Sequence, residues 1–131
     1  MESEHRDESE IKVVDSAYSS PEVVVQLLQR IWPRKRPDAV IFADWAEFIA
    51  ASSYFRRKGI EIGVDVSVVV TADDPMDRWF LPKITHFMIP PRRLARGVRT
   101  WLGAPAGANL SGYRTIQAIW VEGDSVRDLR K

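Results

Sequence analysis

The sequence contains no cysteine, and this absence removes several kinds of chemistry at once. It excludes disulfide bonds, thiolate nucleophiles and metal sites that use cysteine ligands. No apolar run approaches the roughly 20 residues that a membrane helix requires, and no signal-peptide pattern is present. We therefore expect a cytoplasmic protein that does not interact with a membrane.

An excess of charge of one sign is also missing. The 131 residues carry 19 Lys and Arg against 18 Asp and Glu, which gives a formal net charge of +1. This balance argues against a nucleic-acid-binding surface, and the basic cluster Arg34–Arg36 is best interpreted as a solvated connection. The length suits one domain with a substantial core. We expect a polar tail over residues 1–10 and a single α/β domain over residues 11–131.

The centre of the chain predicts a strand, a helix and a second strand. Ala39–Ala43 is an unbroken apolar run, typical of a strand buried on both faces. Asp44, with Glu47 three residues later, has the pattern of a helix N-cap, and Gly59 supplies a left-handed end. Val64–Thr71 is a second apolar, β-branched run. Two strands joined by a helix in this way are expected to be parallel, with a right-handed crossover.

The other elements are predicted on either side of this unit. Helix spacing indicates one buried face on the central helix, and the remaining runs suggest two more helices and three more strands. The residues of that face are Trp45, Phe48, Ile49, Ser52 and Phe55; the helices are Pro21–Ile31 and Arg92–Leu102; the strands are Ile11–Val14, Ile84–Ile89 and Arg114–Val121. The element order predicts an α/β fold with a mainly parallel sheet flanked by helices.

Acidic residues follow three of the predicted strands: Asp15, Asp44, and the pair Asp73 and Asp74. Ligands of open parallel sheets bind beyond the carboxyl ends of the strands, where carboxylates accept hydrogen bonds from hydroxyl groups or hold a hard cation. The alternative is that Asp44 only caps a helix and that Asp73 and Asp74 only form a turn.

No catalytic or phosphate-binding motif is present, and His5 and His86 are not spaced as a metal pair. We interpret His86 as a hydrogen-bonded sheet residue. The residues therefore favour non-catalytic binding without a cofactor over a small α/β enzyme that uses Asp44 and Asp73.

The stretch from Pro37 to Thr85 resembles the C-terminal part of the effector-binding domain of lactose-repressor-type (LacI/GalR) transcription regulators. The family typically shows "PDAV", a helix that ends in Gly, "DVSVVG", "DD.P" with an Arg-aromatic pair, and "P.LT". The positions that match in step are Pro37–Val40, Gly59, Asp65–Val69, Asp73, Pro75, Arg78, Trp79, Pro82, Ile84 and Thr85.

This resemblance implies a type I periplasmic-binding-protein-like fold, in which two subdomains hold a small molecule, usually a sugar or a purine. It also implies a regulator that dimerises through this domain and binds DNA through a helix-turn-helix segment, which this chain lacks. Ala72 occupies the position of the family's ligand-holding Asp, with Asp73 one step later, so we expect weak sugar affinity from this half alone. The expected ligand-binding residues are Asp15, Asp44, Trp45, Ala72, Asp73 and Asp74.

The helix predicted over Arg92–Leu102 has an apolar side with no evident partner, made of Leu94, Val98, Trp101 and Leu102. A contiguous exposed apolar patch is usually hidden by association, most often in a two-fold dimer. We therefore expect a homodimer, although this helix could instead fold back onto its own sheet and leave a monomer. An alternative function is a self-association module of the same fold whose ligand site is degenerate.

Overall fold

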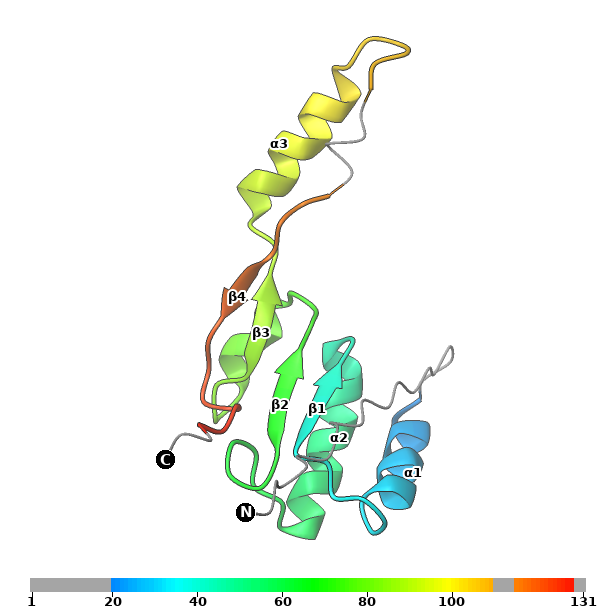
Figure 1. The fold of residues 1–131 in the computed structure, drawn as a ribbon, viewed down its shortest axis with the longest axis vertical. Coiled ribbons are helices and arrows are strands. Elements are labelled where there is room, and N and C mark those ends of the chain that lie inside the picture. The colour runs from blue at the N-terminus through cyan, green and yellow to red at the C-terminus, as the bar shows by residue number, and fades with distance from the viewer. Residues whose placement is uncertain (1–19, 110–114, 129–131) are drawn as a thin grey trace, which may run out of the picture.

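The computed structural model describes residues 20–109 and 115–128. Its main element is a sheet of four strands in the order β1-β2-β3-β4 (Figure 1), in which β1, β2 and β3 are parallel and β4 is antiparallel to β3. The elements are α1 (Pro21–Ile31), β1 (Ala39–Phe42), α2 (Trp45–Lys58), β2 (Ser67–Val70), the 3-10 helix η1 (Pro75–Trp79), β3 (Thr85–Met88), α3 (Pro91–Leu102) and β4 (Ile119–Val121). Among these residues, no helix has the length and apolar character needed to cross a bilayer.

The central unit forms as the sequence predicts. β1 and β2 are parallel neighbours, with Ala39 paired to Ser67 and Phe42 paired to Val70. Residues Val64 and Asp65, predicted to lie in the second strand, instead form a turn before it. The Asp65 carboxylate accepts a hydrogen bond from the Glu61 backbone N–H at 2.8 Å, which stabilises that turn.

The ends of α2 follow from local chemistry. The Asp44 carboxylate accepts the Glu47 backbone N–H at 3.0 Å, and the Glu47 carboxylate accepts the Ala43 N–H at 3.2 Å. These two bonds make a reciprocal cap of the helix N-terminus, displaced by one residue from the usual capping box. The helix ends at Gly59, whose φ of 65° is the left-handed conformation that glycine adopts without steric cost.

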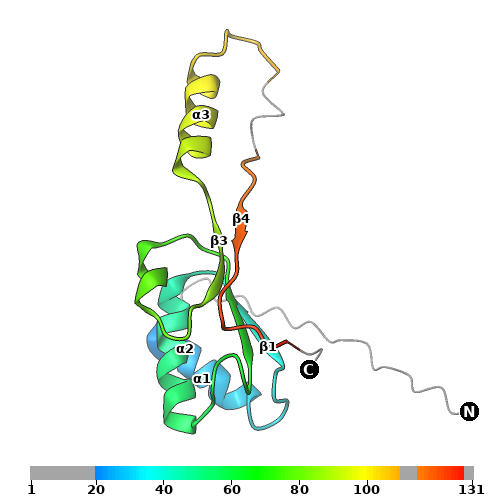
Figure 2. The same ribbon diagram turned by 90° about the vertical axis from the view of Figure 1, so that its left-hand side faces the viewer.

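The core lies between the sheet and the two helices on one of its faces (Figure 2). Val68 and Val70 are fully buried beneath Phe48 and Phe55 of α2, and α1 packs against α2. Trp32, at the end of α1, contacts the ring of Phe55 with a centroid distance of 5.3 Å. The fold therefore depends on an aromatic layer between the helices and the strands.

The prediction that β1 is buried on both faces of the sheet is wrong for the described residues. Ile41 in β1 is 69% exposed, so this strand is not buried on both faces by the residues that the structure describes. The predicted face of α2 is also partly wrong, because Ile49 is 40% exposed while Ala51 and Tyr54 are buried. Both α1 and α2 cover the same face, and the apolar run of β1 did not reveal this asymmetry.

The helix α3 stands beyond the end of the sheet, clear of α1 and α2 (Figures 1 and 2), and none of its residues is buried. The chain then returns beside it, but only Ile119–Val121 of the predicted strand 114–121 pairs with β3. The rest cannot pair because β3 ends at Met88, which is opposite Ile119 in the register, and Pro90 has no N–H to donate. Arg114 and the predicted strand Ile11–Val14 lie outside the described residues.

A buried hydroxyl joins residues 122–128, which we call the closing segment, to two strands. Ser125 Oγ donates to the Val68 carbonyl at 2.7 Å and accepts the Thr85 N–H at 2.8 Å. The Val68 N–H donates to the Ser125 carbonyl at 2.8 Å, and Thr85 Oγ1 accepts the Gly123 N–H at 3.1 Å. These bonds hold the closing segment of the chain against β2 and β3.

Candidate ligand site at the strand ends

The strand-end site lies where β1, β2 and β3 stop. Asp44 and Trp45 follow β1, residues 72–74 follow β2, and Ile89 follows β3. Because the three strands are parallel, their carboxyl ends meet at one edge of the sheet. Thr71 connects the first two ends, with its N–H donating to the Phe42 carbonyl at 2.9 Å and its hydroxyl to the Ala43 carbonyl at 3.1 Å.

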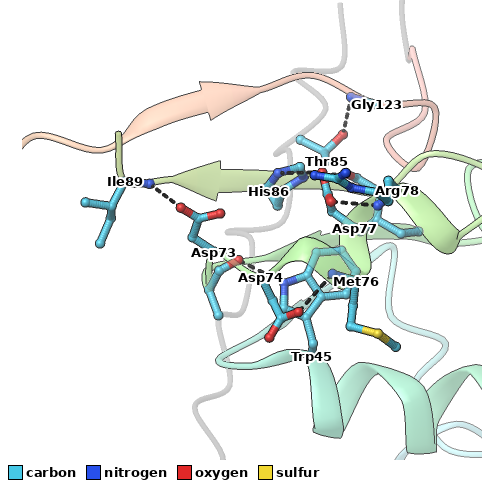
Figure 3. A network of polar contacts seen from close by, with 12 residues as sticks. Trp45, Asp73, Asp74, Met76, Asp77, Arg78, Thr85, His86, Ile89 and Gly123 are labelled. Carbon is cyan, nitrogen blue, oxygen red and sulfur yellow. Dashed lines mark hydrogen bonds and ion pairs between the residues drawn. The ribbon is translucent and has the colours of Figure 1, made fainter. Parts of the chain in front are cut away.

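Asp73 reaches across the site to the end of β3 (Figure 3). Its Oδ2 accepts the Ile89 backbone N–H at 2.9 Å, and the side chain is exposed. A carboxylate has about four acceptor positions, so this one bond leaves it able to accept hydrogen bonds from a ligand. Asp73 therefore joins two strand ends and presents a carboxylate at their edge.

Asp44 and Asp74 both cap helices. Asp44 caps α2 through Glu47, and Asp74 Oδ1 accepts the Met76 N–H at 2.8 Å at the start of η1 (Figure 3). The interpretation of these residues as cap and turn formers is thus confirmed. Asp44 is exposed and Asp74 is half-buried, and whether either also contacts a ligand stays a prediction.

Trp45 lies behind the site and not on its surface. It is 4% exposed, its indole N–H donates to the Ala72 carbonyl at 3.0 Å, and its ring stacks on Phe80 at 5.5 Å. Ala72 is half-buried and packs against the core. These contacts fix the loop that presents Asp73, while direct ligand contact by Trp45 or Ala72 stays a prediction.

His86 supports the same loop from the sheet. It is 4% exposed, its Nδ1 lies 2.9 Å from the Ile84 carbonyl oxygen, and its Nε2 lies 3.5 Å from Asp77 Oδ2 in η1. Figure 3 shows this pair beside Arg78, whose N–H donates to Asp77. The prediction of a hydrogen-bonded sheet residue is confirmed, but the partnership with Asp77 carried no signal in the sequence.

The exposed side chains of the strand-end site are hydrogen-bond acceptors. Within residues 20–109 and 115–128, no group of three or more acidic or histidine side chains is placed to hold a metal ion. Asp44 and Asp73 are exposed carboxylates, which accept hydrogen bonds from hydroxyl or amine groups of a small polar molecule. The predicted site residue Asp15 lies outside the described residues, so its position relative to this edge stays a prediction.

Sequence reasoning missed the contacts that Ser125 and Arg127 make in the closing segment. Ser125 gave no signal because a serine between exposed residues is usually a surface residue, whereas here it is fully buried between two strands. The pair formed by Arg127 Nη2 and Asp38 Oδ1, 2.8 Å apart, joins residues that are 89 positions apart. Partners so far apart in the sequence can be identified only from the three-dimensional arrangement of the strands.

The family described as periplasmic binding protein-like domain matches residues 2–126 of the chain. A search of curated proteins finds no match.

Solved structures give similar folds at low sequence identity. A sugar-binding transcriptional regulator of the LacI family from Escherichia coli, complexed with phosphate, is 16% identical with a TM-score of 0.62; 82% of this chain and 40% of that one are covered. The transcription regulator CcpA of Lactococcus lactis is 17% identical with a TM-score of 0.63, at 82% and 40% coverage. A LacI-family transcription regulation repressor from Corynebacterium glutamicum is 20% identical with a TM-score of 0.61, at 81% and 42% coverage. At these identities the likeness shows the fold, and this chain spans about 40% of each structure.

Proposed function

The chain belongs to the periplasmic binding protein-like domain family, and on that premise we propose that it binds a small polar effector at the strand-end site. The proposed role is that of the effector-sensing part of a LacI-type transcriptional regulator that acts in the cytoplasm. The similar folds are those of transcriptional regulators, which are not enzymes, and this supports a binding role over catalysis.

The observation that carries this proposal is the arrangement of Asp73. Its carboxylate is held by the Ile89 N–H at the edge where three strands end, yet the side chain remains exposed. Asp44 presents a second carboxylate from the neighbouring strand end. Two fixed acceptors suit a ligand with several hydroxyl groups, and the Escherichia coli relative is described as sugar-binding, so we propose a sugar-like effector.

This part of the domain supplies only one wall of the proposed cleft. The similar structures are more than twice as long as the matched region, which leaves room in them for a second wall. In addition, Ala72 cannot accept a hydrogen bond through its side chain, and a charge-assisted hydrogen bond contributes about 1.5–3 kcal/mol. We therefore expect weak, millimolar sugar binding by this chain alone.

The second candidate function is self-association with no ligand. It is favoured by α3, whose apolar residues Leu94, Val98, Trp101 and Leu102 are 46–70% exposed. Because monomers rarely expose such a contiguous patch, we propose that the chain dimerises whether or not the strand-end site binds an effector.

The test is calorimetric titration of the chain with D-glucose, D-galactose and D-ribose, each compared with the Asp73→Asn variant. Asparagine retains one acceptor oxygen for the Ile89 N–H, so the loop is expected to keep its conformation while the charge is removed. The matched control is Glu61→Gln, an exposed carboxylate in the turn between α2 and β2.

Binding that weakens in Asp73→Asn and not in Glu61→Gln supports an effector site. Equal binding by all three proteins places the sugar elsewhere, and no binding at millimolar concentration by any of them favours the self-association module.

A further inference from the structure

Residues 89–118, which contain α3 and the chain on either side of it, carry charge of one sign only. The charged residues of this segment are Arg92, Arg93, Arg96, Arg99 and Arg114, with no lysine and no acidic residue among them. The rest of the chain has 14 Lys and Arg against 18 Asp and Glu. The small net charge of the whole sequence therefore conceals a cationic segment, which attracts anions.

The arginines of α3 repel one another along the helix. Arg96 follows Arg93 by three residues and Arg92 by four, and like charges at these spacings destabilise a helix. Arg92 and Arg93 also lie in the first turn, where the helix macrodipole disfavours cations. Among the described residues, no arginine of α3 forms an ion pair with a carboxylate. An anion bound beside Arg96 would relieve this repulsion.

A cavity of about 210 Å³ lies beside two of these arginines, and we name it the α3 cavity. One wall is the side of α3 that carries Arg93, Arg96, Gly97 and Thr100, and the other wall is the returning segment 115–117. A Cβ atom at position 97 would lie 3.7 Å from the Ile116 side chain, so the missing side chain of Gly97 leaves space between the walls. The arginine side of α3 thus faces a hollow that a small anion can enter.

The two guanidinium groups of the α3 cavity have hydrogen-bond donors to spare. Arg93 Nη1 donates to the Gln117 carbonyl at 3.4 Å, which joins the two walls and holds this guanidinium at the cavity. The Arg96 side chain makes no hydrogen bond with the described residues. Because a guanidinium carries five N–H donors, most of those of Arg93 and all of those of Arg96 remain available. Thr115 and Gln117 add a hydroxyl and an amide from the opposite wall.

This set of donors suits a phosphate group. The planar fork of arginine matches two oxygens of a phosphate, and two guanidinium groups together can bind a dianion. The volume of about 210 Å³ is below the roughly 300–1,000 Å³ of pockets for drug-sized ligands, so the occupant is small. A long polyanion such as DNA is disfavoured because the rest of the chain has more acidic than basic residues.

We propose that the α3 cavity binds a phosphate group, either as the free ion or on a small monoester, through Arg93 and Arg96. This site goes beyond the proposed function and shares no residue with the strand-end site. Phosphate titration and sugar titration therefore succeed or fail independently of each other.

The test is a titration of the chain with inorganic phosphate and with methyl phosphate at constant ionic strength, followed by NMR of the backbone amides. The amide signals of α3 and of residues 115–117 are expected to shift saturably at millimolar phosphate. Neither probe carries the hydroxyl groups of a sugar. Tighter binding of methyl phosphate would identify a monoester as the ligand, and tighter binding of inorganic phosphate would identify the free ion.

The first variant is Arg96→Gln, which removes a charge from the cavity without breaking a contact between the described residues. The dissociation constant for phosphate is expected to rise at least about tenfold, which corresponds to the loss of a charge-assisted hydrogen bond. The matched control is Arg99→Gln, which removes the same charge from the same helix outside the cavity. Its dissociation constant is expected to change less than about threefold, because exposed charges are screened by solvent and salt.

The second variant, Gly97→Leu, distinguishes a cavity from a merely cationic surface. Leucine fills the space between the walls while every arginine remains, and it is a better helix former than glycine, so α3 is retained. Binding of phosphate is expected to be lost. The control Ala95→Leu adds the same side chain at an exposed position outside the cavity and should bind phosphate as the unaltered chain does.

Three outcomes overturn the proposal. If Arg96→Gln and Arg99→Gln weaken binding equally, phosphate responds to the charge of the helix and not to a site. If Gly97→Leu binds phosphate normally, the ion lies outside the cavity. If millimolar phosphate shifts no amide signal of α3 while a short DNA duplex does, the cationic segment is a nucleic-acid-binding surface.

Discussion

Aromatic side chains occur at both ends of this molecule, but they are buried at one end and exposed at the other. In the unit formed by α1, β1, α2 and β2, aromatic residues are buried, and Phe48 and Phe55 are each 1% exposed. In α3, the aromatic residue Trp101 is 57% exposed and no residue of the helix is buried. The apolar content of a helix therefore does not tell whether that helix stabilises its own chain or is available to another one.

The largest expected effect is on the buried end. Phe48→Ala or Phe55→Ala should lower the free energy of unfolding by about 3–5 kcal/mol, because each substitution removes a ring from a closed core and leaves a cavity. Urea unfolding followed by far-UV circular dichroism measures it. An unchanged denaturation midpoint in both variants would mean that the buried rings of α2 contribute no more to stability than the exposed side chains of α3.

A smaller loss is expected at the buried hydroxyl that joins β2, β3 and the closing segment. Ser125→Ala removes the acceptor of the Thr85 N–H and the donor to the Val68 carbonyl, and it should cost about 1–3 kcal/mol. The measurement is again the urea midpoint, with Ser53→Ala as the control on the exposed side of α2. A loss no greater than that of the control would show that the closing segment is held by other contacts.

The cap of α2 should contribute less. Asp44→Ala removes the acceptor of the Glu47 N–H and is expected to cost about 1 kcal/mol, whereas Asp44→Asn should cost only a few tenths, because asparagine caps almost as well. Thermal unfolding of the two variants side by side tests this. Equal losses would indicate that charge, and not the capping bond, is what Asp44 supplies.

The smallest effect is expected on α3. At a concentration where the chain is monomeric, Trp101→Ala should change the free energy of unfolding by less than about 0.5 kcal/mol, as for other surface substitutions. At higher concentration the same variant should lose association. A large loss of unfolding free energy in the monomer would contradict the contrast between α3 and the buried unit, because Trp101 would then pack on its own chain.

The sequence predicted the central unit well because its signals are local. Asp44, Gly59 and the apolar runs around them act over a few residues, and the resemblance to LacI-type regulators rests on the same stretch. The errors concern which face is covered. The pattern of β1 is the same whether a covering layer belongs to the chain or to a partner, so the exposure of Ile41 could not be read from it.

The strand-end site was only partly predictable. Parallel strands bring Asp44 and Asp73 to one edge, and this follows from the order of elements alone. The bond from the Ile89 N–H to Asp73, the pair of His86 with Asp77 and the bonds of Ser125 depend on the paths of loops, for which no periodic pattern exists. Whether Asp44 and Asp73 bind an effector stays a prediction.

The pairing of β3 with β4 suggests that the segment between these two strands could be removed from the chain. Met88 and Ile119 are opposite each other in an antiparallel ladder, so the chain leaves for α3 and comes back at neighbouring points. In topological terms residues 89–118 are an insertion at the tip of a β-hairpin. A type I′ turn of about two residues would close that hairpin in their place. The residues that remain carry the whole hydrophobic core, so the shortened chain is expected to fold without α3.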